Sequence, residues 1–153
     1  MDNRPGLTNA VTLKFEELTV QQLYEVLQLR AEVFVVEQDC VYQDIDGYDD
    51  QAYHVLIYDQ ATLVAYTRIL PPGSYFDELS IGRVLVKKTH RLLNLGHKLM
   101  TTSLEFAQEL YPGSVIKISA QQYLIKFYES HGFVSFGKGY LEDGIPHIGM
   151  KRC

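Results

Sequence analysis

Residues 81–99 constrain the fold of this chain more than any other segment does. Residues 81–86 are apolar apart from Arg83, a basic turn follows, and a helix with Leu99 and Met100 on one side comes next. Such a run predicts a buried strand that leads through a short turn into an amphipathic helix. The N-terminus of a helix carries unpaired N–H groups and a partial positive charge, so this turn has the chemistry of an anion-binding site.

The residues of the turn favour that interpretation without deciding it. Asn94 tolerates a left-handed backbone conformation, and Gly96 leaves room where a ligand could approach the main chain. Lys87, Lys88 and Arg91 add positive charge to an otherwise acidic protein. Because glycines are common in loops, an ordinary solvated connection explains the same spacing equally well.

Length and composition describe one globular domain. The 153 residues are 46% hydrophobic and 22% charged, which excludes a disordered chain, a collagen-like chain and a disulfide-rich miniprotein. The net charge of −5 argues against a nucleic-acid partner, because binding to phosphates needs a concentrated positive surface. Two cysteines, no signal-peptide pattern and no apolar run of about 20 residues favour a cytoplasmic protein without a membrane partner.

The order of the expected elements indicates the class of fold. We expect a disordered leader over residues 1–10 and a single domain over residues 11–153. A capping-box pattern at Thr19 and Gln22 starts the first helix, and Pro112 ends the long one. Strands are expected at residues 11–15, 53–58, 63–70, 81–86, 115–120, 133–136 and 145–150. Hairpins early and crossover helices late predict an α/β fold with a mixed, mostly antiparallel sheet and helices on both faces.

Several segments together resemble one protein family. The turn Arg91-Leu92-Leu93-Asn94-Leu95-Gly96 looks like the pyrophosphate-binding motif of the GNAT N-acetyltransferases, Gln/Arg-x-x-Gly-x-Gly/Ala, with Asn94 in place of the first glycine. Residues 124–133 resemble the second signature of the family, an apolar helix with Phe-Tyr followed by Gly-Phe. Residues 29–40, 42–47 and 142–150 are similar to its ElaA-like branch.

The resemblance implies a fold and an activity. The central sheet of the family is splayed at a V-shaped opening between two parallel strands, which here would be residues 81–86 and 115–120. The implied activity is transfer of an acetyl group from acetyl-CoA to an amine, by direct attack in a ternary complex. The backbone of the first strand would hold the pantetheine and acetyl group through Val84, Leu85 and Val86. The backbone of the turn would hold the pyrophosphate through Arg91, Leu92, Leu93, Asn94, Leu95 and Gly96.

The implied reaction needs groups that move protons. A free alkylamine has a pKa of about 10.4, so it must lose a proton before it attacks. The candidate bases are Glu37, His54 and His147, and for each of them a structural role is an equally good interpretation. A chain of water molecules is another route for the proton. Tyr128 matches the position in the family of the acid that protonates the departing thiolate, with a packed aromatic residue as the alternative.

Three questions stay open at the level of sequence. A non-catalytic protein that binds or senses CoA on the same fold is the rival to an enzyme. The amine acceptor is a small molecule or a peptide amine of unknown identity. Exposed edge strands also leave a homodimer open.

The acidic residues 39–50 have more than one interpretation. A solvated acidic loop is the expected one, and attraction of a cationic acceptor is the functional alternative. An EF-hand calcium site fails because Tyr48 replaces a ligand and Gly47 comes two positions early, so no metal is expected. Cys40 has no basic partner nearby in the sequence, which favours a small buried thiol over a nucleophile.

Overall fold

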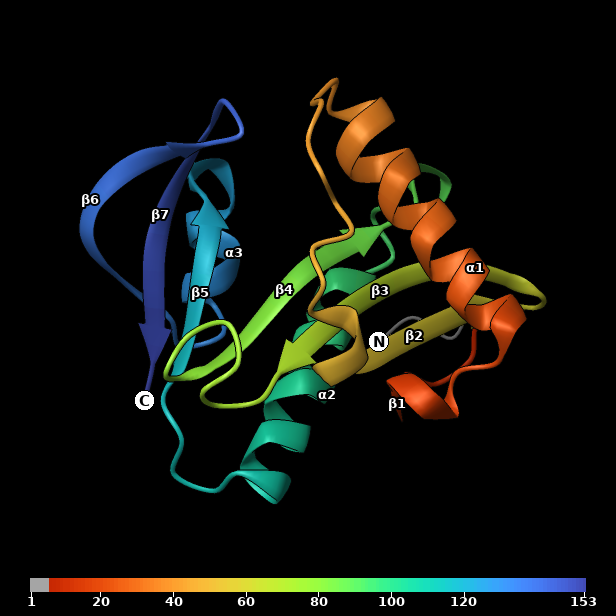
Figure 1. Ribbon diagram of the computed structural model, residues 1–153, viewed down its shortest axis with the longest axis horizontal. Coiled ribbons are helices and arrows are strands. Elements are labelled where there is room, and N and C mark those ends of the chain that lie inside the picture. The colour runs from red at the N-terminus through yellow and green to blue at the C-terminus, as the bar shows by residue number, and fades with distance from the viewer. Residues whose placement is uncertain (1–5) are drawn as a thin grey trace.

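The computed structural model describes residues 6–153, whose strands form a seven-stranded sheet (Figure 1). In spatial order the strands are β1 (Val11–Lys14), β2 (Tyr53–Asp59), β3 (Thr62–Leu70), β4 (Leu79–Val86), β5 (Ile116–Gln121), β7 (Ile145–Arg152) and β6 (Val134–Glu142). All neighbouring strands are antiparallel except β4 and β5, which are parallel. The sheet is therefore mixed and mostly antiparallel, as the order of elements predicts.

Helices cover both faces of this sheet. They are α1 (Val20–Arg30), the π-helical η2 (Ala31–Glu37), α2 (Leu95–Leu110), α3 (Ile125–Glu129) and the 3₁₀ turns η1 (Phe15–Glu17), η3 (Asp49–Gln51), η4 (Lys88–His90) and η5 (Gln122–Leu124). The predicted capping box starts α1, because Thr19 and Gln22 exchange hydrogen bonds of 2.9 and 3.0 Å. No helix within residues 6–153 is long and apolar enough to span a membrane.

Two separate cores lie on the two faces. α1 and η2 pack with Leu56, Tyr66 and Leu85 on one face. α2 and α3 pack on the other face, where Val84 and Val86 contribute to the larger core. In Figure 1, α1 crosses in front of β2 and β3, and α2 lies behind the sheet. The helices on both faces confirm the prediction, and the alternation of Val84, Leu85 and Val86 between the cores is that of a strand.

The two parallel strands separate after a short contact. Leu79 pairs with Ile116 and Ser80 pairs with Lys117, and beyond these pairs β4 and β5 diverge (Figure 1). Within β4, Arg83 and Val84 lie opposite the single residue Thr67 of β3, and Arg83 has a φ of 52°. This is a β-bulge, which bends its strand and increases the local twist. The V-shaped opening expected between residues 81–86 and 115–120 is therefore present.

Two expectations about chain segments are wrong. Residues 6–10 are not part of a disordered leader, since the Thr8 N–H donates to the Tyr58 carbonyl at 2.8 Å and Leu7 forms a bridge with Asp59. The remainder of that leader, residues 1–5, lies outside the described residues. The strand expected at residues 133–136 is longer than predicted, because β6 continues to Glu142 and turns into β7 through Asp143 and Gly144. Both turn residues have positive φ, 52° and 79°, as an Asp-Gly hairpin turn requires.

Candidate functional site

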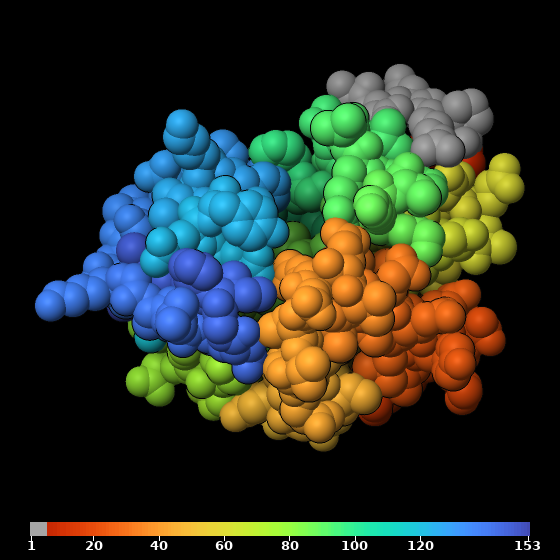
Figure 2. Space-filling view, turned by 90° about the horizontal axis from the view of Figure 1, so that it is seen from above, coloured from red at the N-terminus to blue at the C-terminus, as the bar shows by residue number. Residues whose placement is uncertain are grey.

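A cavity of about 740 Å³ occupies the opening between β4 and β5. In the space-filling view the molecule is hollowed between the blue C-terminal part and the green and orange segments (Figure 2). The lining residues come from η2, from β3 and β4, from α3, and from the turn between β6 and β7. The cavity therefore lies where strand pairing is missing, which is where backbone groups are open to a ligand.

The open edge of β4 forms one wall. The Lys87 N–H donates to the Val64 carbonyl of β3 at 2.7 Å. Because alternate residues of an antiparallel strand face the same neighbour, Leu85 also points its backbone groups at β3. Val84 and Val86 then point theirs into the opening, and the Val86 carbonyl accepts a hydrogen bond from Arg91 Nε at 3.1 Å. Of the three residues expected to hold pantetheine, the register selects Val84 and Val86 and excludes the N–H of Leu85 as a donor into the cavity.

The turn before α2 has the shape expected of an anion-binding turn. Leu92 and Asn94 both have left-handed backbone conformations, with φ of 70° and 58°. Asn94 is the N-cap, and the first hydrogen bond of α2 joins the Lys98 N–H to its carbonyl. Alternating conformations of this kind aim successive N–H groups at one point and can form an anion-binding nest. The side chains have other roles: Leu95 is buried and Leu92 is exposed, so a ligand here would meet backbone.

The residues around position 96 do not require a glycine there. A Cβ atom at this position would meet only Phe127, at 3.4 Å, which is ordinary van der Waals contact. The φ of Gly96 is not in the positive range that favours glycine. Nothing within residues 6–153 therefore requires a glycine at this position.

Tyr128 lies in α3 and lines the cavity. It is 7% exposed, and its hydroxyl makes no hydrogen bond within the described part of the chain. Burial raises the pKa of Tyr128, and the nearby Tyr123 adds to the effect. The phenol is therefore neutral near pH 7 and has a proton to donate. Its position in the cavity fits the acid implied by the family motif.

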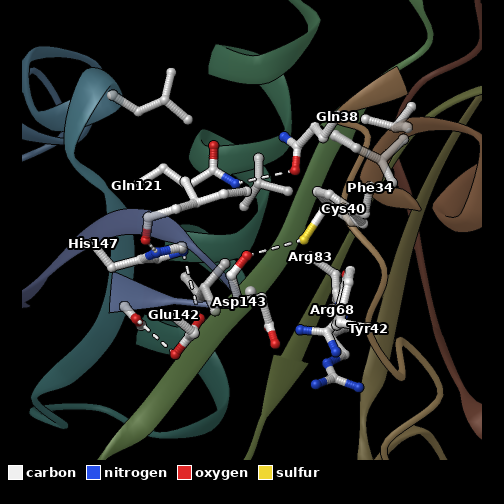
Figure 3. A pocket seen from close by; sticks show the side chains of 18 of the residues that line it. Phe34, Gln38, Cys40, Tyr42, Arg68, Arg83, Gln121, Glu142, Asp143 and His147 are labelled. Atoms are coloured by element: carbon white, nitrogen blue, oxygen red, sulfur yellow. Dashed lines mark hydrogen bonds and ion pairs between the residues drawn. The ribbon is translucent and has the colours of Figure 1, made fainter. Parts of the chain in front are cut away.

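His147 lies in β7 and also lines the cavity (Figure 3). Its Nδ1 is 2.7 Å from the Ile145 carbonyl, which can only accept a hydrogen bond, so we assign the proton to Nδ1. Nε2 is then the unprotonated nitrogen, and it lies 3.5 Å from Glu142 Oε2. An imidazole that gains a proton at Nε2 would be stabilised by this carboxylate. An unprotonated ring nitrogen and a carboxylate therefore lie together among the residues that line the cavity.

The other two candidate bases do not fit the geometry. His54 is fully buried and is not among the lining residues; its nitrogens contact the Tyr66 hydroxyl at 2.5 Å and the Asp49 carbonyl at 2.9 Å. Burial lowers the pKa of His54, as expected of a structural histidine. Glu37 lines the cavity but pairs with Arg91 at 2.5 and 2.9 Å. That hydrogen bond lowers the pKa of Glu37, which makes it a weak base.

The acidic loop is not solvated as expected. Asp39 and Asp50 are exposed, but the other three carboxylates pair with one arginine each from α1, β3 and β4, in a cluster made of Arg30, Arg68, Arg83, Asp44, Asp46 and Asp49. Burial alone would raise the pKa of Asp46, but hydrogen bonds and charge from Arg68, together with the charge of Arg83, bring it down to about 2. The one signal in the sequence was Arg83, an arginine inside an apolar strand. We call this group the arginine–aspartate cluster.

Two hydrogen bonds join lining residues from different segments across the cavity (Figure 3). Cys40 Sγ donates to the Asp143 carbonyl at 3.3 Å, and Gln121 Nε2 donates to Gln38 Oε1 at 3.4 Å. Cys40 is buried and has no disulfide, as expected of a small buried thiol. The segment that follows η2 is thereby joined to the turn between β6 and β7 through Cys40 and to the end of β5 through Gln38, so segments far apart in the sequence meet at the cavity.

Comparisons with known proteins agree with this geometry. The family model of the acetyltransferase (GNAT) domain matches residues 15–152. Protein ElaA of Escherichia coli (strain K12) is 46% identical over 142 residues, which cover 92% of this chain and 93% of that protein. An acyl-CoA N-acyltransferase structure from Pseudomonas aeruginosa has a TM-score of 0.90 at 40% identity, covering 95% of this chain and 100% of that one. The E. coli ElaA crystal structure gives 0.88 at 44% identity, with coverages of 94% and 97%.

The chain therefore belongs to the GNAT acetyltransferase family. Its fold is that of acyltransferases which take an acyl-CoA as co-substrate and an amine as acceptor.

Proposed function

We propose that this protein is an N-acetyltransferase that moves the acetyl group of acetyl-CoA to an amine by direct attack. The observation that carries the proposal is the divergence of β4 and β5 after two paired residues, which leaves one edge of β4 open. A cavity of about 740 Å³ fills the opening and has room for both a pantetheine arm and an acceptor. Both cysteines are free, which fits the reducing cytoplasm, where we place the protein.

Two backbone regions support the binding of acetyl-CoA. The pantetheine amides can pair with the outward N–H and C=O groups of Val84 and Val86, as a neighbouring strand would. The diphosphate fits the N–H groups from Arg91 to Gly96, where the turn meets the positive end of α2. Once bound, acetyl-CoA supplies the activated acyl group as a thioester, and all further steps depend on side chains and backbone of this chain.

His147 is the group we assign to the amine. Its Nε2 accepts the amine proton, and Glu142 stabilises the imidazolium that forms. The freed nitrogen lone pair forms the new C–N bond, the nitrogen then loses its second proton to water, and the C–S bond breaks. An N–H group of the open β4 edge, at Val84 or Val86, donates to the acyl oxygen as negative charge develops there.

Tyr128 is the group we assign to the thiolate. Its hydroxyl has no partner within residues 6–153 and carries its proton at neutral pH, so it can donate that proton to the departing sulfur. The products are then an N-acetylated amine and free CoA. The proton taken by His147 passes to solvent and Tyr128 regains one, which restores both groups for the next turnover.

The test begins with binding and then measures turnover. Calorimetric titration with acetyl-CoA should show saturable binding, and heat indistinguishable from dilution overturns the proposal. Acetyl-CoA, propionyl-CoA and a longer acyl-CoA are then mixed with a panel of primary amines, and free thiol is followed. Acetyl transfer above background supports the enzyme. Tight binding without thiol release for any amine supports the rival, a non-catalytic CoA-binding protein.

Replacement of Tyr128 by Phe sharpens the assignment of the acid. We expect kcat to fall by about 10²-fold, because general acid catalysis contributes about that much, while KM for acetyl-CoA stays within about threefold. The hydroxyl has no hydrogen bond to lose within the described residues, so stability should not fall. An unchanged kcat removes Tyr128 from the mechanism.

A further inference from the structure

One wall of the cavity carries arginines that are paired with aspartates, and we call it the arginine wall; the facing wall carries carboxylates. Arg68 of β3 and Arg83 of β4 line one wall, and Glu142, Asp143 and His147 from the β6–β7 region line the other (Figure 3). The side chain of Tyr75 lies within electrostatic reach of both walls. Burial raises its pKa, Glu142 raises it further, and Arg83 acts in the opposite direction. A ligand in the cavity therefore meets guanidinium groups on one side and carboxylates on the other.

The arginine wall has hydrogen-bond donors that no acceptor of the described residues uses. Within the arginine–aspartate cluster, Arg30 donates from Nε, Nη1 and Nη2, and it does not line the cavity. Arg83 donates from Nε and Nη2, and its Nη1 makes no hydrogen bond with residues 6–153. Arg68 is 3% exposed, and its Nε is the one buried side-chain nitrogen or oxygen of the described residues without a partner. Buried donors are normally satisfied, so this wall is incomplete without a ligand.

We propose that the acceptor is a primary amine that also carries a carboxylate, with the carboxylate on Arg83 and Arg68 and the amine toward His147. This assignment rests on the proposed acyl transfer and names the class of acceptor. A carboxylate has two oxygens that can accept hydrogen bonds, and its bonds with a guanidinium are stronger than those of a neutral acceptor, so it suits the unused Arg83 Nη1 and Arg68 Nε better than a neutral group does. Glu142 and Asp143 on the other wall favour the ammonium form of the arriving amine. An amino acid satisfies both walls together, whereas a polyamine leaves the arginine donors unpaired.

The experiment compares acceptors that differ only in the carboxylate. Initial rates of thiol release from acetyl-CoA are measured for a panel of amino acids, for their amides, and for the corresponding amines without a carboxyl group. An amide is the less basic amine and attacks more readily at neutral pH, so a preference for the acid cannot come from nucleophilicity. We expect the best amino acid to exceed its amide by about 10- to 100-fold in kcat/KM, the value of one or two charged hydrogen bonds.

Each outcome separates this assignment from the acyl transfer on which it rests. Acetylation of amides and plain amines at rates equal to or above those of the acids overturns the assignment and leaves acyl transfer intact. No acetylation of any amine overturns acyl transfer and the assignment with it. Among carboxylates, free amino acids and short peptides are compared directly, and each is a supporting result that identifies the source of the group.

Variants locate the carboxylate on the arginines. Arg83→Gln should reduce the advantage of the acid over its amide, measured as a ratio of kcat/KM within the same variant, to less than about threefold. Arg83→Lys keeps the charge but loses the planar fork, so an intermediate advantage is expected. Lys138→Gln, which removes an exposed cation that does not line the cavity, should leave the advantage intact. An undiminished advantage in a folded Arg83→Gln protein contradicts the assignment.

Discussion

Two regions of this protein contain buried polar side chains and differ in how many of their hydrogen-bonding groups have a partner. In the interior of the arginine–aspartate cluster, Arg30 is fully buried and donates to Asp44 and Asp49 from every nitrogen it has. At the cavity wall, Arg83 Nη1 and the Tyr128 hydroxyl make no hydrogen bond within residues 6–153. The first region is complete as folded, and the second has capacity left for a ligand.

The difference separates stability from chemistry. A saturated buried ion cluster loses much when one member is removed, because the remaining charges stay buried without compensation. An unsaturated group loses little of the folded state's energy, since it has few contacts to lose. Substitutions in the first region should therefore lower the free energy of unfolding, and substitutions in the second should lower turnover or ligand affinity.

The largest effect is expected for Arg30→Met. Asp44 and Asp49 would lose a partner that pairs with them at 2.9 and 2.7 Å, so the free energy of unfolding should fall by about 3–5 kcal/mol. Urea unfolding followed by far-ultraviolet circular dichroism measures it. The matched control is Lys87→Met, which removes an exposed pair with Glu32 at 3.1 Å and should cost no more than about 1 kcal/mol. Equal losses in the two variants would break the distinction between the regions.

His147→Gln should lower turnover strongly and change stability little, the reverse of what is expected for Arg30→Met. We expect kcat to fall by about 10²- to 10³-fold, because the general base is lost. Unfolding should change by no more than about 1.5 kcal/mol, the value of the hydrogen bond to Ile145. His131→Gln is the control, since that ring pairs with His97 outside the cavity lining. Normal turnover in His147→Gln would show that His147 is not the general base.

Gly96→Ala should raise the stability of the protein and lower its affinity for CoA. Alanine is favoured over glycine within a helix, so the free energy of unfolding should rise by about 0.5–1 kcal/mol, less the adjustment to Phe127 at 3.4 Å. The new methyl group would occupy space that a diphosphate needs, and we expect the Kd for CoA to rise about tenfold, one lost interaction of about 1.4 kcal/mol. Calorimetry and urea unfolding measure the two quantities. An unchanged Kd would show that the diphosphate does not approach this residue.

Local signals in the sequence predicted most of the fold, and long-range pairing hid part of the site. The cap at Thr19, the left-handed Asn94 and the apolar β4 depend on neighbours within a few residues, so the sequence carries them directly. The arginine–aspartate cluster joins residues 14 to 39 positions apart, and no local pattern marks such pairs. For the same reason His54 looked available as a base, because its partner Tyr66 comes from the next strand.

The register of the sheet explains the remaining differences at the site. That Leu85 faces β3 and Val86 faces the opening follows only from the pairing of Lys87 with Val64, which composition and periodicity do not fix. The position of His147 opposite the arginine wall likewise depends on the hairpin turn at Asp143, which pairs β6 with β7. Tyr128 could be located in advance because the motif that carries it is contiguous in sequence.

The smallest effect is expected for Glu37→Gln, and it is the sharpest check on the choice of base. The hydrogen bond from Arg91 lowers the pKa of Glu37 in the folded protein below its value in the unfolded chain. The ion pair therefore stabilises the protein fully at a pH above the unfolded pKa. This stabilisation is lost as the pH falls through the folded pKa. Both side chains are partly exposed, which limits the loss near pH 7 to about 1 kcal/mol, with no difference between variant and wild type at the acid end. Urea unfolding across pH 2–7 measures this. Turnover should stay within about threefold, because Glu37 is engaged at the turn expected to hold the diphosphate rather than beside His147. A loss of kcat comparable to that of His147→Gln would make Glu37 the base and would place the chemistry at the other end of the cavity.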